Sequence, residues 1–257
     1  MSKIWIAAEE PVAPRVAHGI GLLEAALKGC GCPVERLTRP LGAADYRSGD
    51  GWKIFVGVRG ESRFIDELER EEILAYNTAP PEGEGFYLAS CPGRLIAVVG
   101  GSPSGALYGC QELARVIAER GELPLEIARG EAPAFRLRGP ALGLQKMKVE
   151  PPRRTYEYPI TPGRFPWFYD RERWIRYLDT LLEHRCNVVY LWSGHPFSSL
   201  VKLEDYPEAL EVTEEEFALN VETFRWLTRE ADKRGIWVVL KFYNIHIPLP
   251  FAQKHGL

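Results

Sequence analysis

The sequence predicts an α/β protein, with a small N-terminal α/β sandwich-like domain followed by the first three βα units of an incomplete TIM barrel. Residues 170–192 read as a helix and an apolar strand, and a polar loop follows them. Residues 213–246 repeat this order. Helices that alternate with buried apolar strands are typical of parallel sheets, where ligands meet the carboxyl ends of the strands. Shorter strand and helix patterns before residue 130 predict the separate first domain.

Composition and charge exclude several classes of protein. The 257 residues carry a formal net charge of −3, which gives no reason to expect nucleic acid or a membrane surface as a partner. No apolar run is long enough to span a bilayer, and the N-terminus lacks the apolar segment of a signal peptide. We therefore expect a cytoplasmic location, with a secreted or periplasmic one left open. The five cysteines lack the spacing of a usual metal site and are predicted to be reduced and mostly buried.

The predicted first domain spans residues 1–130. Strands are expected at 3–8, 33–37, 52–58 and 125–128, a helix at 14–28 and a hairpin at 86–99. A second helix follows Ser102, which can cap it, has Pro103 at its first position and ends at Gly121. The glycine-rich start of this helix lacks the pattern of a P-loop or of a dinucleotide-binding turn. We interpret its glycines as allowing the helix to pack tightly on the sheet.

The predicted second domain spans residues 131–257 and begins with a short linker and a strand at 135–144. The connection 145–169 contains six aromatic residues and five prolines, which indicates an ordered segment with a functional role. The next helix is expected to be capped by Asp170, and the one after it by a capping box of Thr213 and Glu216. Strands at 186–192 and 236–240 follow these helices.

Two motifs resemble known families of glycosidases. The segment 100–117, with Gly-Ala-Leu-Tyr-Gly at 105–109, resembles the helix that closes the small N-terminal domain of α-glucuronidases and β-N-acetylhexosaminidases. Pro-x-Phe-Arg-x-Arg-Gly at 133–139 resembles the start of their catalytic barrel. The resemblance implies a glycoside hydrolase that acts on O-glycosidic bonds of an oligo- or polysaccharide, with uronic acid or N-acetylhexosamine units as the candidate sugars. We expect a carbohydrate substrate, no metal and no other cofactor.

The chain also departs from these families. Lys146 occupies the position where hexosaminidases have the arginine that binds the sugar. Gly143 occupies the position of the aspartate on their first barrel strand. Their acidic third-strand motif is replaced by residues 240–243, Leu-Lys-Phe-Tyr. In the families resembled, the acid and base residues lie on later strands, and no Asp or Glu ends the three predicted strands here. We therefore expect the catalytic carboxylates, still unknown, to lie beyond residue 257 in a longer polypeptide.

The candidate substrate-binding residues share a place at or just after the carboxyl end of a predicted strand. They are Lys146, Trp192, His195, Lys241, Tyr243 and Asn244. Trp192 and Tyr243 offer rigid aromatic surfaces for sugar faces, although Trp192 fits a barrel core equally well. His195 fits a hydrogen bond to sugar hydroxyls or a structural role. Lys241 lies in an otherwise apolar strand, where an unpaired charge is costly, so we expect it to face a pocket.

Two hypotheses about recognition stay open. The basic residues Lys146, Lys148, Arg153, Arg154 and Arg164 could bind the carboxylate of a uronic acid, or they could form a solvated loop surface. The main alternative to a glycosidase is a non-catalytic carbohydrate-binding or scaffold protein built on the same fold, and an unrelated barrel enzyme is a third. The sequence predicts neither the sugar and linkage, nor a retaining or inverting outcome, nor the oligomeric state.

Overall fold

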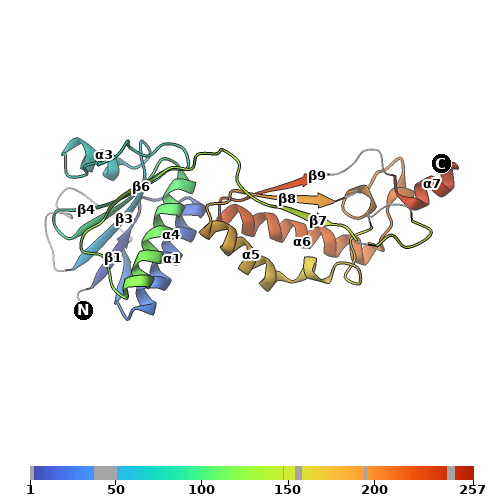
Figure 1. Ribbon diagram of the computed structural model, residues 1–257, viewed down its shortest axis with the longest axis horizontal. Coiled ribbons are helices and arrows are strands. Elements are labelled where there is room, and N and C mark those ends of the chain that lie inside the picture. The colour runs from blue at the N-terminus through green and yellow to red at the C-terminus, as the bar shows by residue number, and fades with distance from the viewer. Residues whose placement is uncertain (1–2, 38–50, 147, 154–157, 194–195, 242–246) are drawn as a thin grey trace. The chain divides into compact units, whose positions relative to one another are not determined.

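The computed structural model describes residues 3–37, 51–146, 148–153, 158–193, 196–241 and 247–257 (Figure 1). The chain divides into two compact units, one made of Met1–Arg136 with Lys233–Gly235, the other of Leu137–Asp232 with Ile236–Leu257. The first unit contains a six-stranded sheet and the second a three-stranded one. No helix in the described ranges is both long and apolar enough to cross a membrane.

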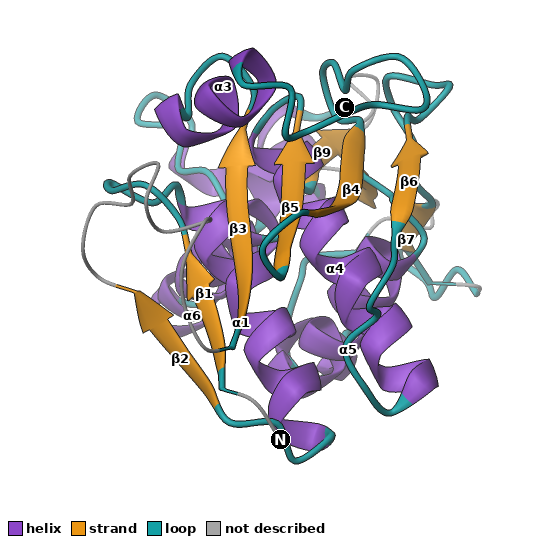
Figure 2. Cartoon of the chain, turned by 90° about the vertical axis from the view of Figure 1, so that its left-hand side faces the viewer, coloured by secondary structure: helices purple, strands orange, loops and turns teal. Residues whose placement is uncertain are grey.

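The first unit is an α/β layer structure around the six-stranded sheet. Its strands are β1 (Ile4–Ala7), β2 (Val34–Leu37), β3 (Trp52–Val58), β4 (Phe86–Cys91), β5 (Leu95–Gly100) and β6 (Ala128–Glu131), and its helices are α1 (Pro14–Gly29), α3 (Arg63–Arg70) and α4 (Pro103–Arg120). The strand order is β2-β1-β3-β5-β4-β6 (Figure 2). The first four strands in this order run parallel, whereas β4 is antiparallel to both of its neighbours.

The helices of this unit cover both faces of the sheet. On one face, α4 approaches so closely that a Cβ added at Gly109 would lie 2.8 Å from Cγ1 of Val98. On the other face, Ile65 of α3 belongs to the same buried cluster as Phe55 of β3. Alternate residues of a strand point to opposite faces, so each face has an apolar layer of its own. The predicted tight packing of the glycine-rich helix is confirmed.

Helix α3 was not expected from the sequence. The side chain of Ser62 accepts a hydrogen bond from the Ile65 backbone N–H at 3.4 Å and caps the helix. Phe64, Ile65 and Leu68 form its buried face. A serine followed by apolar residues at these spacings is a valid helix signal, but it covers only two turns among many charged residues.

Three predicted boundaries were wrong. Strand β6 begins at Ala128 rather than at Leu125, whose side chain is 68% exposed. Strand β7 begins at Ala141 rather than at Phe135, which is 74% exposed. Helix α1 continues through Gly29, which was expected to follow its end. Pairing with a neighbouring strand decides where each strand begins, and that pairing is not visible in local apolar content.

The second unit consists of parallel strands with helices on one side. Its strands are β7 (Ala141–Leu144), β8 (Val188–Ser193) and β9 (Trp237–Lys241), its helices are α5 (Arg171–Glu183), α6 (Glu214–Lys233) and α7 (Leu249–His255), and its short 3-10 helices are η1 (Pro166–Tyr169), η2 (Pro196–Ser198) and η3 (Pro207–Ala209). The sheet order is β7-β8-β9, and both pairs are parallel. The expected α/β class with a parallel barrel-type sheet is confirmed.

Both predicted helix caps in this unit are confirmed. The carboxylate of Asp170 accepts a hydrogen bond from the Arg173 backbone N–H at 2.9 Å. Thr213 and Glu216 form a reciprocal capping box, with backbone-to-side-chain distances of 3.0 and 3.2 Å. These bonds satisfy N–H groups that have no partner within the helix.

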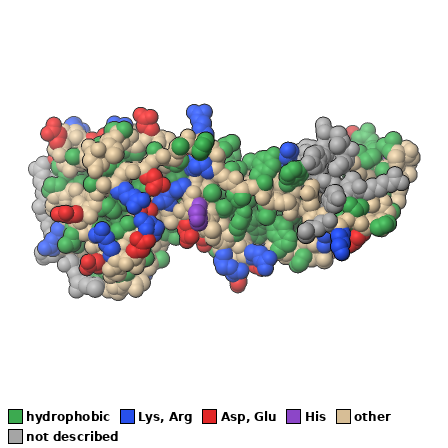
Figure 3. Space-filling model, viewed as in Figure 1, with side chains coloured by type: hydrophobic (Ala, Val, Ile, Leu, Met, Phe, Trp, Pro, Cys, Tyr) green, Lys and Arg blue, Asp and Glu red, His purple; other side chains and the backbone are tan. Residues whose placement is uncertain are grey.

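The two faces of the three-stranded sheet differ in exposure. Val189 and Leu191 are fully buried on the face that packs with residues of α5 and α6. The opposite face exposes 64% of Trp237 and 36% of Val239, so the expectation of a fully buried third strand was wrong. Hydrophobic side chains gather on this part of the surface (Figure 3). Within the described residues the sheet does not close into a barrel, and this face lacks the covering that a closed barrel provides.

Buried contacts hold the described residues 158–169 of the long connection between β7 and α5. Phe165 and Phe168 lie in the core of the second unit. Asn220 of α6 donates hydrogen bonds to the carbonyl oxygens of Ile160 at 2.9 Å and Ser199 at 3.1 Å. Ile160 in turn donates from its backbone N–H to the Ser199 hydroxyl at 2.8 Å. This buried network joins two βα loops to a helix, and it supports the predicted order for the described residues 158–169 of the connection.

Candidate functional site

The carboxyl ends of β7, β8 and β9 bring predicted site residues together. The register aligns Gly143 of β7 with Trp192 of β8, and Trp192 with Lys241 of β9. Residues in one row of a parallel sheet point to the same face, so Trp192 and Lys241 are neighbours on the face that the helices leave open. Gly143 adds no side chain to this row, which leaves space in front of β7.

The Lys241 side chain lies over two aromatic rings. Its ammonium nitrogen is 5.1 Å from the ring centroid of Trp192 and 6.0 Å from that of Tyr190. An ammonium group at this distance is attracted to the negative face of an aromatic ring. Lys241 itself is exposed, and both aromatic residues are half-buried. Sequence reasoning missed Tyr190 as a site residue, although its separation of two from Trp192 on a strand predicts the same face.

Lys146 follows β7 at the same edge of the sheet. Its ammonium nitrogen lies 5.7 Å from the ring centroid of Phe165, in the long connection that follows. The side chain is half-buried. The site therefore has a second cation close to an aromatic ring, just after β7 and not on β9, the strand of Lys241.

Three of the predicted site residues lie outside the described residues. They are His195, Tyr243 and Asn244. His195 belongs to the loop after β8, and the other two belong to the segment after β9. Their part in the site stays a prediction.

Glu211 and Arg153 form a buried ion pair that sequence reasoning missed. The Arg153 guanidinium donates to the Glu211 carboxylate, and their side chains are only 15% and 7% exposed. The backbone N–H of Leu249, at the start of α7, also donates to Glu211 at 3.3 Å. Glu211 thus connects the loops that follow all three strands. Because its charge is paired here, Arg153 has a structural role, and the hypothesis that it binds a uronic acid loses support.

The ring of Tyr158 lies beside two arginines of the predicted basic set, Arg153 and Arg164. The guanidinium carbons of Arg153 and Arg164 lie 5.1 and 5.5 Å from its ring centroid. Its hydroxyl accepts a hydrogen bond from the Glu150 backbone N–H at 2.7 Å. The main chain of the exposed Glu150 is therefore held in this loop. Arg154 lies outside the described residues.

The described part of the site contains cations and aromatic rings but no carboxylate on a strand. Strands β7, β8 and β9 contain neither Asp nor Glu. Among the residues that the structure describes, no group of three His, Cys, Asp or Glu side chains could hold a metal ion. This surface can stack on a sugar ring and pair with an anionic group. Acid–base catalysis needs groups from elsewhere.

The fold of this chain is shared with parts of several glycoside hydrolases of known structure. Over 99% of its length, the chain superposes with a TM-score of 0.81 on a GH138 enzyme targeting pectin rhamnogalacturonan II, to which it is 38% identical. The chain covers 26% of the length of that enzyme. The predicted resemblance to glycosidases is therefore confirmed at the level of the glycoside hydrolase fold.

More distant solved structures share the fold. A family GH115 4-O-methyl-α-glucuronidase with specificity for decorated arabinogalactans matches 92% of this chain at 18% identity and a TM-score of 0.53, over 28% of its own length. A Streptomyces plicatus β-hexosaminidase matches 93% at 14% identity and a TM-score of 0.51, over 41% of its length. No family model matches the sequence, and no curated protein does.

Proposed function

We propose that this chain is part of a glycoside hydrolase that cleaves O-glycosidic bonds in a polysaccharide with uronic acid units. The observation that carries the proposal is the 38% identity, over 99% of the chain, to a GH138 enzyme targeting pectin rhamnogalacturonan II. The cations beside the aromatic rings support an acidic sugar as the ligand. Pectin-type polysaccharides are accordingly the substrate class that we propose.

In this proposal Trp192, Tyr190 and Lys241 form one wall of the substrate site. The aromatic rings stack on a sugar face, and the Lys241 ammonium pairs with the sugar carboxylate. Lys146 supplies a second positive charge from the other side of β8. We propose that Tyr243 adds a further stacking surface, and that His195 and Asn244 add hydrogen bonds to sugar hydroxyls.

Hydrolysis requires two carboxyl groups on either side of the scissile bond, or one such group and a nucleophile from the substrate. We propose that these groups come from strands beyond residue 257, since β7, β8 and β9 contain neither Asp nor Glu. An N-acetylhexosamine substrate is less favoured, because Lys146 and Gly143 replace the sugar-binding arginine and the aspartate of the resembled hexosaminidases.

A non-catalytic carbohydrate-binding or scaffold protein is the second candidate. The lack of a strand carboxylate in the described sheet favours it. The two candidates differ in whether pectin is hydrolysed. If the protein is a glycosidase, the full-length gene product should release reducing sugar from pectin. Binding without any release would favour the second candidate.

The recognition part of the proposal can be tested by calorimetry. Glucuronate and galacturonate would be titrated into the chain and compared with glucose and galactose. We expect tighter binding of the acids, and we expect Lys241→Gln to weaken it about fivefold, as for an exposed ion pair. Arg176→Gln, which removes an exposed charge from α5 on the helix side of the sheet, is the control. Equal affinity for acidic and neutral sugars, unchanged in Lys241→Gln, would contradict the proposal.

A further inference from the structure

The first unit has a crevice between the carboxyl ends of β1 and β3. At this point the order of the strands in the sheet changes direction relative to their order in the sequence. Strand β1 is followed by α1 and then by β2 on one side, whereas β3 pairs with the other side of β1. The helix after β1 lies on one face of the sheet, and the helix after β3 lies on the opposite face. The two loops therefore leave the carboxyl ends of β1 and β3 in opposite directions. In open parallel sheets, this switch point is where ligands bind.

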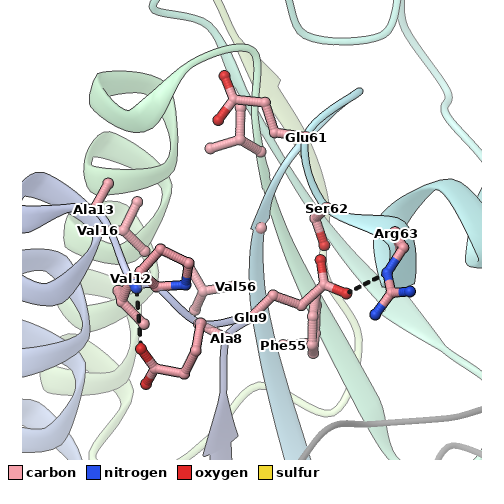
Figure 4. Close-up of a pocket in the computed structure, with 14 residues that line it drawn as sticks. Ala8, Glu9, Val12, Ala13, Val16, Phe55, Val56, Glu61, Ser62 and Arg63 are labelled. Atoms are coloured by element: carbon pink, nitrogen blue, oxygen red, sulfur yellow. Dashed lines mark hydrogen bonds and ion pairs between the residues drawn. The ribbon is translucent and has the colours of Figure 1, made fainter.

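The crevice is a cavity of about 510 Å³ (Figure 4). Its walls are the loop 8–13 after β1, the carboxyl half of β3 at 55–58 and the start of α3 at 61–63. Small-molecule sites in proteins have volumes of roughly 300–1,000 Å³, so the cavity has room for one or two sugar rings.

Glutamates from both loops line the crevice. Glu9 comes from the loop after β1 and approaches Arg63 at 4.0 Å. Glu61 comes from the loop after β3 and lies on another side of the opening (Figure 4). Glu10 turns back toward its own loop, where its carboxylate accepts a hydrogen bond from the Val12 N–H at 3.1 Å. The lining thus has three acidic residues and one basic residue, with a net negative charge.

The opposite wall is apolar and ends at the start of a helix. Val12, Ala13 and Val16 face the carboxylates from the side of α1 (Figure 4). Among the described side chains none caps α1, which begins at Pro14 after Ala13. The first turn of a helix has backbone N–H groups without intrahelical acceptors. The crevice therefore has carboxylate hydrogen-bond acceptors on one side and an apolar surface that ends at the first turn of α1 on the other.

This combination selects among ligand classes. The carboxylates disfavour a phosphate or a carboxylate ligand, although switch points often bind nucleotides. An amine could pair with the carboxylates but could not accept from the helix N-terminus. A sugar hydroxyl both donates and accepts, and the C–H groups of a sugar ring can lie against valine side chains. No metal is implied, because among the described side chains no suitable group of three ligands exists.

We propose that the crevice between β1 and β3 binds a neutral saccharide, with Glu9 and Glu61 as acceptors of its hydroxyl protons. The site belongs to the first unit and is distinct from the surface that carries Trp192 and Lys241. It prefers uncharged sugars, whereas that surface is proposed to prefer acidic ones. The opposite preferences make the two sites distinguishable in one experiment.

The test is an NMR titration of the whole chain with cellobiose, lactose and maltose, and separately with galacturonate and inorganic phosphate. We expect at least one neutral disaccharide to shift the backbone signals of 9–13 and 56–63, and phosphate to leave them unchanged. In the Glu9→Gln/Glu61→Gln variant the affinity should fall about tenfold, as for loss of charge-assisted hydrogen bonds. Glu122→Gln, at an exposed position of the same unit, is the matched control.

Three results would overturn the proposal. One is that none of the three disaccharides shifts the crevice signals at millimolar concentration. Another is that the double variant binds as the unaltered protein does. The third is that phosphate or galacturonate shifts the same signals more strongly than any neutral sugar. If galacturonate does not bind at Lys241 while a neutral disaccharide still binds in the crevice, only the proposed acidic substrate is contradicted.

Discussion

Single residues decide how closely the strands of the second unit approach one another. Gly139 precedes β7 and runs beside the start of β8, where the neighbouring Arg138 carbonyl accepts from the Asn187 N–H at 2.8 Å. A Cβ added at Gly139 would collide with the carbonyl group of Val188. At Gly143, four residues later on the open face, an added Cβ meets nothing within 4 Å. The Arg-Gly motif of the sequence therefore has a steric reason.

Gly139→Ala should destabilise the protein strongly, whereas Gly143→Ala should not. The added methyl group at 139 forces two backbone segments apart, and overpacking of this kind costs about 3 kcal/mol. For Gly143→Ala we expect the free energy of unfolding to change by no more than about 1 kcal/mol, because only the backbone flexibility of glycine is lost. Urea unfolding of both variants, followed by circular dichroism, measures the difference. Equal midpoints for the two variants would show that the backbone contact at Gly139 is unimportant.

At the scale of elements, the short helix α7 is held by one acidic residue and an aromatic cluster. Glu208 of η3 accepts from His255 at 2.8 Å and pairs with Lys254 at 2.9 Å. The ring of Phe251 lies 5.5 Å from Tyr206 and 4.3 Å from His255, centroid to centroid. A helix of seven residues is not stable alone, so these contacts decide whether it forms.

The α7 contact should weaken in acid. The Lys254 ammonium above all, together with the Glu208 main chain and His255, lowers the pKa of Glu208 to about 2 from an ordinary value of 4.5. A carboxylate with a lowered pKa stabilises the folded form above its ordinary pKa, and this contribution disappears as the pH falls from 4.5 toward 2. Amide exchange of 249–255, measured by NMR across this range, should accelerate before that of α5.

Glu208→Gln should remove this pH dependence and raise exchange in α7 at neutral pH. The control is Glu172→Gln, at a 90% exposed side chain on α5 that should affect only its own helix. Protection of α7 that stays constant down to pH 2 in the unaltered protein would show that Glu208 does not hold this helix.

At the scale of the whole molecule, two units with separate cores are joined by a stretch without regular structure. Between β6, which ends at Glu131, and β7, which begins at Ala141, Phe135 is 74% exposed and Leu137 is 70% exposed. Large apolar side chains are usually buried, so this stretch belongs to neither core.

Limited digestion with chymotrypsin should cut after Phe135 or Leu137 before it cuts any strand. Proteases act on exposed chain that is not held in regular structure. Mass spectrometry of the first products should show a break between the two units, and the Phe135→Ser/Leu137→Ser variant should resist cleavage there. Early cleavage within β3, β5 or β8, with this stretch intact, would contradict the division.

Local features of the structure could be predicted from the sequence because they depend on local chemistry. Asp170 and the Thr213–Glu216 box form the expected caps, since capping involves residues three positions apart. The exact limits of β3 and α4 also agree with prediction. The pattern of helices and strands also indicated that Trp192 and Lys241 lie near the carboxyl ends of parallel strands, whereas the register that aligns them came from the structure.

Features that depend on distant partners could not be predicted. Glu211 is 58 residues from Arg153, and its burial follows from the meeting of three loops. The crevice between β1 and β3 depends on the strand order, which no local pattern encodes. The exposed face of β9 is equally non-local, because an apolar strand looks the same whether one or both of its faces are covered.

Residue type and short spacing were enough to predict the α/β class, the caps, the cations at the strand ends and the resemblance to glycosidases. Which charges are paired, which sheet face is open and where the cavity lies became known only from the folded chain, because burial and ion pairing depend on residues brought together from distant parts of the sequence. Lys241 beside Trp192, and Arg153 beside Glu211, are similar cations in the sequence but differ in what surrounds them.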